Sequence, residues 1–406
     1  MAKTKERKPL ERKNWVASFT LIGEAKVGDY TFSIDQRSEK SDWIYNRMNL
    51  QVDCGSKYGK IDAQMMGGYG SERNNVIYVH GKDENGRDDF KNFYTIDWED
   101  RFDDSILSDI GDLAFITVGL EKDTKDKTFY KKFLTPYDAI AYIQEHLENG
   151  MVVNVKGNLK YQLYNDTVTC QKEITSIVLS KAEPENYRAS FTQTILIDKD
   201  SATKNDIDKD KGVLNVTAYV IEKYKEFNGY DLTNGGKVKG GLYVPLRKNY
   251  EFTLDMEKPE KTAAILSKIF KVKKGVDQVT FDGHFEEVGS TITTTIEDLP
   301  EDIVELIELG LYTEEEALTK CSTNDNKDRR MILDKPNIKL VGEEDSKTPI
   351  INRVENAYDE EDLLLDCLVP KATDDDEVPF NDDEDVVEEV ATTEDDDLEA
   401  LLAALD

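Results

Sequence analysis

The feature that most constrains the fold is a pattern that occurs twice in the chain. Residues 139–161 read AIAYIQEHLENGMVVNVKGNLKY, and residues 264–287 read AILSKIFKVKKGVDQVTFDGHFEE. Each copy runs from helical apolar spacing, through a glycine that ends the helix, into an alternating strand that contains a second glycine, Gly157 or Gly283. The copies lie too far apart for a solenoid period. The pattern therefore predicts duplication of a whole small domain.

The segments around the first copy predict the domain type. Trp43–Val52 alternates, with Ile44, Met48, Leu50 and Val52 on one face and Asn46 as the exception. Lys60–Met66 alternates again and predicts a hairpin with it, and Thr167–Leu179 follows the copy. Several β runs, a helix and two strands are the order of an OB-fold, in which the glycines would mark sharp strand bends. An SH3-like barrel or a sandwich has a similar strand count, and the helix position argues against both.

The predicted fold class is mainly β with short helices, as two tandem OB-like barrels followed by a disordered acidic tail. VASFTLIG near the start and RASFTQTILI from residue 188 mark the two beginnings, with a boundary near residues 183–186. We divide the chain into a basic arm, 1–14, a first domain, 15–183, with an insertion at about 67–136, a second domain, 187–342, with an acidic helical pair at 303–309 and 313–319, and a tail, 343–406.

The charge is concentrated in that tail. The chain carries −32, of which residues 343–406 contribute −22, from 25 acids against three bases. Such a segment is too charged to bury a core, and it serves either as a solubilising extension or as a docking segment. Docking is favoured by two sets of residues. The first is an acidic run that leads into a short apolar segment, and the second is a group of leucines at helical spacing. They are Asp374, Asp375, Asp376, Val378, Pro379 and Phe380, and then Leu398, Leu401, Leu402 and Leu405.

Cofactor chemistry is not indicated. The four cysteines form no CxxC pair and the three histidines are scattered, so we expect free thiols, no metal and no cofactor. No apolar run is long enough to span a membrane, and we expect no secretory signal. These observations predict a cytoplasmic protein, in the host cytoplasm if the chain is viral.

Aromatic and basic residues on the non-core faces of the strands predict a site for single-stranded nucleic acid, which needs stacking platforms and a basic groove. On the first barrel they are Trp43, Tyr45, Arg47, Lys60, Lys131, Lys132, Lys156, Lys160 and Tyr164. On the second barrel the candidates are Lys223, Tyr224, Lys225, Tyr230, Lys239, Tyr243 and Arg247, and the last three lie in a glycine-containing segment, 237–248, expected to form a mobile basic loop that could close over a strand. Cross-strand packing and ordinary solvent exposure account equally well for any one of them.

These segments resemble a known family. VVNVKGNLKY, CQKEITSIVLSKA and an acidic tail containing DDDEVPF are similar to single-stranded DNA-binding proteins, particularly the diverged ones of tailed bacteriophages. Bacterial members end in an acidic run followed by Ile-Pro-Phe, whereas here the motif is internal, 26 residues before the end. The resemblance implies OB-folds, binding of single-stranded DNA or also RNA, and a tail that recruits replication or recombination proteins. We expect the tail to compete for the groove, and a homo-oligomer is compatible with this assignment.

Three other functions compete with this one. An enzyme is not expected, because the sequence has no nucleophile elbow, paired-histidine motif or P-loop. DWEDRFDD, at residues 97–104, could hold Mg²⁺, although a charged turn is the commoner meaning of such a cluster. The main alternative is a structural or assembly protein of tandem barrels that binds proteins. An acidic decoy is disfavoured because the acids lie mostly in the tail.

Overall fold

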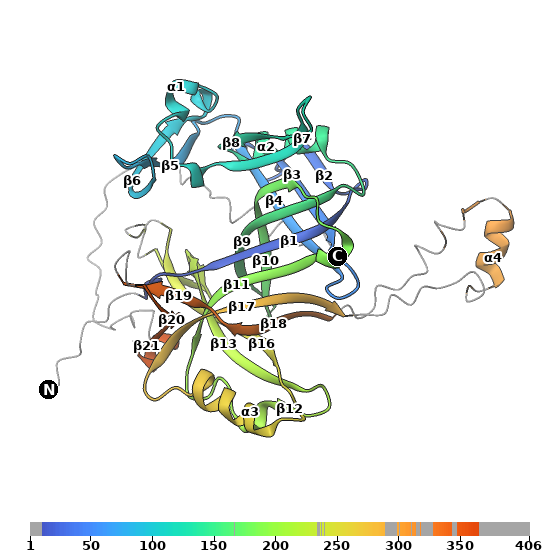
Figure 1. Cartoon of the computed structure of the whole chain (residues 1–406). Helices are drawn as coiled ribbons and strands as arrows, with labels where there is room; N and C mark the ends of the chain where they lie inside the picture. Colours follow the sequence, from blue (N-terminus) through green and yellow to red (C-terminus); the bar gives the residue numbers. More distant parts are fainter. Residues whose placement is uncertain are drawn as a thin grey trace, which may run out of the picture.

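The computed structural model describes residues 10–165, 167–233, 236, 238, 240–288, 299, 301–309, 311–313, 317, 328–342 and 347–364 (Figure 1). Strands account for 54% and helices for 15% of the structure, which confirms the mainly β class. No helix among these residues is long and apolar enough to span a membrane.

The first barrel is closed by five strands. They are β1 (Ala17–Lys26), β3 (Trp43–Asp53), β4 (Lys60–Gly70), β9 (Val152–Tyr164) and β10 (Thr167–Leu179). β1 pairs antiparallel with β3 and β9, β3 with β4, and β9 with β10. A parallel pairing of β4 with β10 closes the barrel. This is the strand order of an OB-fold.

The second barrel repeats the order. Its strands are β11 (Arg188–Ile197), β13 (Val213–Tyr224), β16 (Leu242–Thr253), β17 (Val276–Val288) and β18 (Asp328–Pro336). β11 pairs with β13 and β17, β13 with β16, and β17 with β18, all antiparallel. β16 and β18 close the barrel in parallel. Two OB-like barrels therefore follow one another, as the repeated pattern predicts.

A helix lies between the third and fourth strands of each barrel. α2 (Pro136–His146) starts with proline after the cap residue Thr135, and it buries Ala139, Ile140 and Ile143 in the core. α3 (Pro259–Ile265) continues into a π-helical turn, Leu266–Phe270, whose Phe270 is buried. The helix position that separates an OB-fold from other small barrels is thus confirmed.

The two glycines of the repeated pattern sit at equivalent places. Gly157 pairs with Phe19 of β1, and Gly283 pairs with Phe191 of β11. A Cβ on Gly157 would lie 1.8 Å from the carbonyl oxygen of Glu173, and one on Gly283 would lie 2.3 Å from that of Ile332. Each fifth strand has a register shift beside this contact. At Gly157 and at Gly283 the strand therefore bends, and only glycine leaves room for the backbone of the neighbouring strand to come so close.

The barrels are joined edge to edge. β1 and β11 pair antiparallel with Phe19 opposite Phe191, so equivalent residues meet at the centre and the two barrels are related by an approximate two-fold rotation. The pairing merges both barrels into one 15-stranded sheet with a continuous apolar core. Leu163 also donates its amide to the Tyr224 hydroxyl at 3.0 Å, across the two barrels.

The remaining elements are additions to the two barrels. In the first domain they are β2 (Phe32–Arg37), β5 (Val76–Lys82), β6 (Asp88–Asp97), η1 (Trp98–Asp100), α1 (Asp104–Leu107), η2 (Asp112–Ala114), β7 (Ile116–Lys122) and β8 (Thr128–Phe133). After it come η3 (Pro184–Asn186), η4 (Lys204–Asp206), β12 (Ile207–Asp208), β14 (Glu226–Phe227), β15 (Tyr230–Asp231) and α4 (Glu301–Glu308). β7 extends the first barrel by pairing parallel with β10, and β5 and β6 form a separate hairpin. Of the second expected acidic helix, only residues 313 and 317 are described.

The expected end of the second domain at residue 342 needs correction. β19 (Ile338–Val341) pairs with β20 (Thr348–Ile351), and β21 (Arg353–Tyr358) pairs with β17, followed by η7 (Glu360–Leu363). Arg353 binds the buried Asp277 through its Nε at 2.9 Å, which fixes β21 to the barrel. The acidic composition hid these short strands. The arm 1–9 and the docking residues Asp374–Phe380 and Leu398–Leu405 lie outside the described residues.

Candidate nucleic-acid interface

The outer face of β3 and β4 carries the largest group of the sequence-predicted residues on one surface. Met48, Leu50 and Val52 are buried, so their neighbours along β3 point out of the barrel. The register pairs Tyr45 with Gly68, Arg47 with Met66, Asn49 with Gln64, Gln51 with Asp62, and Asp53 with Lys60. In OB-folds this strand face, with the loop before it, binds oligonucleotides.

Trp43 and Tyr45 form one aromatic unit on this face. Their rings stack at a centroid distance of 4.7 Å with planes 17° apart. Trp43 is only 4% exposed, and Tyr45 is half-buried. The buried Trp43 ring therefore holds the Tyr45 ring in place by stacking against it. Of the two rings, Tyr45 retains the exposed surface on which a base can stack.

Arg47 is the most informative residue of the face. It is half-buried, and burial lowers the pKa of its guanidinium. Within the described part of the chain, it makes no ion pair and its side chain makes no hydrogen bond. A partly buried cation without an anionic partner costs free energy unless a ligand supplies the anion. Its position beside Tyr45 fits the phosphate that follows a stacked base.

Other cations lie on this ladder or beside it. Lys60 is exposed at the start of β4 and pairs with Asp53, eight residues along β3 from Tyr45. Arg37, the last residue of β2, pairs with Ile44, and both Arg37 and Lys40 are exposed. Among the described residues none of the three has an ion-pair partner. Of the nearby carboxylates, Asp62 binds Arg329 at 2.8 Å and Asp42 lies 3.7 Å from Arg73, whereas the exposed Glu39 makes no ion pair within the described residues. Arg47 and Lys60 thus place positive charge on the face, on which Asp53 and Asp62 also lie.

The remaining candidates of the first domain are less available. Lys160 forms an ion pair with Glu173 at 2.7 Å, and Lys132 one with Asp112 at 2.9 Å. Lys131 lies over the Tyr142 ring, 4.4 Å from its centroid. Lys156 and Tyr164 are exposed on β9, away from the β3–β4 ladder.

The second barrel places its candidates differently, because the chain's own arm covers part of its outer face. The Arg12 guanidinium lies 5.3 Å from the Tyr243 ring centroid and binds Glu222 at 2.7 Å. Leu10 is buried against Ile221 nearby. Lys223 also lies over Tyr243, at 5.6 Å. Tyr243 is therefore occupied by residues of this chain.

Further along the same barrel, Arg247 is exposed and pairs across the strands with Tyr219. Tyr224 is engaged by Leu163 through its hydroxyl, Lys225 is half-buried beside it, and Tyr230 is 55% exposed on β15. Lys239 lies outside the described residues. The structure thus groups Tyr45, Arg47 and Lys60 on one face and disperses the second set.

Sequence reasoning missed Arg37, Lys40 and Tyr219. The first two lie in or after β2, a short strand with register shifts and no clear alternation. Tyr219 lies on β13, and the alternation of that strand would have shown it to point outward. Sequence reasoning also missed the exposed aromatic residues of the β5–β6 hairpin, which lies within the expected insertion at 67–136.

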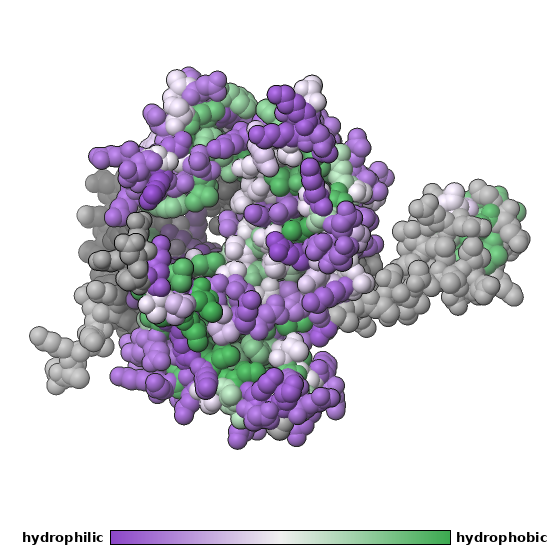
Figure 2. Space-filling view, in the orientation of Figure 1, coloured by the Kyte–Doolittle hydropathy of each residue, from purple (hydrophilic) through white to green (hydrophobic). Residues whose placement is uncertain are grey.

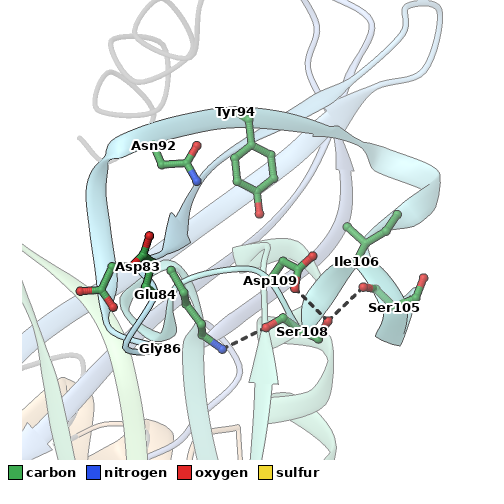
Figure 3. A pocket seen from close by; sticks show the side chains of 10 residues that line it. Asp83, Glu84, Gly86, Asn92, Tyr94, Ser105, Ile106, Ser108 and Asp109 are labelled. Carbon is green, nitrogen blue, oxygen red and sulfur yellow. Dashed lines mark hydrogen bonds between the residues drawn. The ribbon is translucent and has the colours of Figure 1, made fainter.

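A cavity beside the β5–β6 hairpin does not suit a nucleic acid (Figure 3). It is lined by β5, β6 and the α1 region, with a volume of about 730 Å³. Asp83, Glu84 and Asp109 line it together, and Lys82 is turned to the carbonyl oxygen of Ser108 at 3.1 Å. Tyr94 points into it, and burial, followed by the charge of Asp109, raises the pKa of this phenol. Three carboxylates around one opening would repel a phosphodiester.

Comparisons with known proteins give limited information. A family model described as YorF matches residues 115–271, less than half of the chain, from β7 to the end of the α3 region. No curated protein matches the chain. A solved structure of a deletion mutant of the single-stranded DNA binding protein from Thermus aquaticus is similar at 10% identity and a TM-score of 0.29, covering 68% of this chain and 88% of that one. At that TM-score the likeness carries no argument, so the function below rests on the geometry.

Proposed function

We propose that this chain is a sequence-tolerant, non-enzymatic single-stranded DNA-binding protein whose main site is the outer face of β3 and β4. The observation that carries the proposal is Arg47, a half-buried cation without an anionic partner among the described residues, beside the supported ring of Tyr45. Together they offer what one nucleotide needs, a platform for its base and a charge for its phosphate.

The rest of the face favours single strands over duplex. A base can stack on Tyr45 only when it is not paired inside a helix, whereas Lys60, Arg37 and Lys40 contact phosphates of any sequence. Asn49 and Gln64 face each other across the strands and add donors and acceptors without fixing one base. Binding should therefore be strong, dependent on salt and tolerant of sequence.

In the cell, we propose that the chain acts in the cytoplasm during phage DNA replication or recombination. The acidic tail would recruit partner proteins and compete with DNA for the basic face. This part of the proposal rests on the concentration of acidic residues in the tail and on the resemblance of the tail to known single-stranded DNA-binding proteins.

The test is fluorescence anisotropy of a labelled oligo-dT of about 30 nucleotides over a salt series. Tyr45→Leu removes the platform, and we expect affinity to fall about 5- to 100-fold, since one stack contributes about 1 to 3 kcal/mol. Arg47→Met should lower the slope of log affinity against log salt by about 0.7. Lys261→Met, an exposed change on α3, should leave both values unchanged.

Failure would be clear. If the unchanged protein binds no single strand at low salt, or binds duplex as tightly, the proposal is wrong. An assembly protein would then be the better candidate, because one face of the β19–β20 ribbon exposes Ile338, Leu340 and Ile351. Those side chains are 65%, 63% and 48% exposed, a pattern that suits contact with another protein.

A further inference from the structure

The β5–β6 hairpin carries exposed aromatic side chains on one face. Tyr78 is 82% exposed, Phe93 is 67% and Phe90 is 55%. The register pairs Tyr78 with Thr95 and His80 with Phe93, which places Tyr78, His80 and Phe93 on the same side of the ribbon. Large aromatic side chains so exposed on a two-stranded ribbon indicate a contact surface.

This face is held rigidly from within. The ring of Phe90 lies on that of His80 at a centroid distance of 4.5 Å and 32° between planes. His80 is 7% exposed and lies 2.7 Å from Asp88, whose other contact is the amide of Leu113 at 2.8 Å. The aromatic face therefore has a fixed support, as a stacking platform needs.

The other side of the hairpin serves a different purpose. Val79 and Ile96 are buried there against Ile110, and Tyr94 points into the acidic cavity. Asp83, Glu84 and Asp109 line that cavity together with Tyr94 (Figure 3). Arg87, whose amide donates to the Asp83 carboxylate at 2.9 Å, and Lys91 are exposed at the turn end of the hairpin, and neither has an ion-pair partner within the described segments. Asp97, paired with Val76, lies at the far end of the aromatic side.

The hairpin is also attached close to the main site. The amide of Trp98 donates to the carbonyl of Asn75 at 3.1 Å, and the Trp98 ring lies 5.1 Å from that of Tyr69 on β4. The next residue, Gly70, pairs with Trp43. Figure 1 shows β5, β6 and α1 at the same end of the molecule as β2 and α2, and at the opposite end from α3. The hairpin therefore joins the barrel at the end of the β3–β4 ladder where Trp43 lies, and the attaching residue Tyr69 pairs with Ile44, on the opposite face from Tyr45.

The molecular surface is hollowed below the insertion. Figure 2 shows a hollow between the insertion, at the upper left, and the second barrel below it, and the hollow is bordered by both hydrophobic and hydrophilic residues. A mixed border suits a nucleic acid, which offers apolar base faces and charged phosphates together.

We propose that the aromatic face of the β5–β6 hairpin is a second base-stacking surface, which extends the site on β3 and β4 for longer single strands. The inference rests on the proposed function and adds two or three platforms to it. Tyr78 and Phe93 would stack bases directly, Phe90 would do so on its His80 support, and Arg87 and Lys91 would contact phosphates at the turn.

The test uses the full chain and oligo-dT of about 10 and about 30 nucleotides, since one OB-fold covers roughly 4 to 16. The double variant Tyr78→Leu, Phe93→Leu keeps apolar surface but removes the rings. We expect it to bind the longer strand at least about fivefold more weakly and the shorter strand normally. The matched control, Tyr78→Phe with Phe93→Tyr, keeps the rings and should bind both strands like the unchanged protein.

A second measurement locates the contact. Oligonucleotides carrying 5-iodouracil cross-link to stacked aromatic side chains under light, and we expect adducts at Tyr78 or Phe93 with the longer strand only. Normal binding of the longer strand by the leucine variant, with no adduct on the hairpin, would overturn the proposal. If Tyr45→Leu still weakened binding in that case, the proposed function would stand. If the unchanged protein bound neither strand, both proposals would fail, and the hairpin would be a protein-docking face.

Discussion

Replacing Gly157 by alanine should destabilise the first barrel strongly. The added Cβ would lie 1.8 Å from the carbonyl oxygen of Glu173 and 2.8 Å from the ring of Phe19. The ring can rotate away, but the carbonyl belongs to β10, so the strands must separate by at least about 1.2 Å to restore a 3.0 Å contact. Overpacking of this kind costs typically 1 to 3 kcal/mol, and each ladder hydrogen bond lost adds about 1 kcal/mol.

Alanine also restricts the unfolded chain more than glycine does, which stabilises the folded protein by only about 0.4 to 1 kcal/mol. We therefore expect the free energy of unfolding to fall by about 3 kcal/mol in total. The assay is urea unfolding followed by tryptophan fluorescence, with stability read from the midpoint. Gly28→Ala is the control, because nothing lies within 4 Å of its added Cβ, and it should be neutral or slightly stabilising. Equal midpoints for the two variants would refute the argument, and so would rescue of Gly157→Ala by Phe19→Leu, which leaves the carbonyl in place.

Two further predictions concern groups that hold the frame together. Arg353→Met leaves the buried carboxylate of Asp277 without its ion pair, and we expect a loss of about 3 to 5 kcal/mol by the same urea assay, so a loss below about 1 kcal/mol would contradict it. For His284, burial opposes the charged form, but Asp334 and Glu286, 2.8 and 3.1 Å away, outweigh it and raise the pKa. Charged His284 therefore adds stability below its unfolded pKa, about 6.5, and loses it as pH rises through the higher folded value. The change in stability between pH 5.5 and pH 8.5 should be smaller in His284→Gln, and an unchanged difference would contradict this.

The local pattern predicted much of the fold. Alternation in Trp43–Val52 identified the core face of β3 and even its exception, since the buried Asn46 donates to the carbonyl of Tyr137 at 2.8 Å. The helix followed by a glycine and a strand identified both α2 and α3, and Gly157 and Gly283 proved equivalent. These features depend on residues that are close together in the sequence, so a single sequence was enough to predict them.

The candidate site was predicted only in part. Alternation gave the correct face for Trp43 and Tyr45 but not the burial of Trp43, which depends on what covers the strand. No local pattern could show that Arg12, more than 200 positions away, lies over Tyr243. Acidic composition concealed β21, because a strand that is stabilised by Asp277 and Arg353 needs few apolar residues of its own.

The sequence by itself determined the class of each segment and the repetition of the domain, because side-chain period and glycine position act within a few residues. Only the tertiary structure decided that β1 pairs with β11, that β4 and β10 close the first barrel, and that Arg47 is left beside Tyr45 without an anionic partner among the described residues. Those outcomes join residues far apart in the chain, and the free energy that selects them comes from contacts that no local pattern contains.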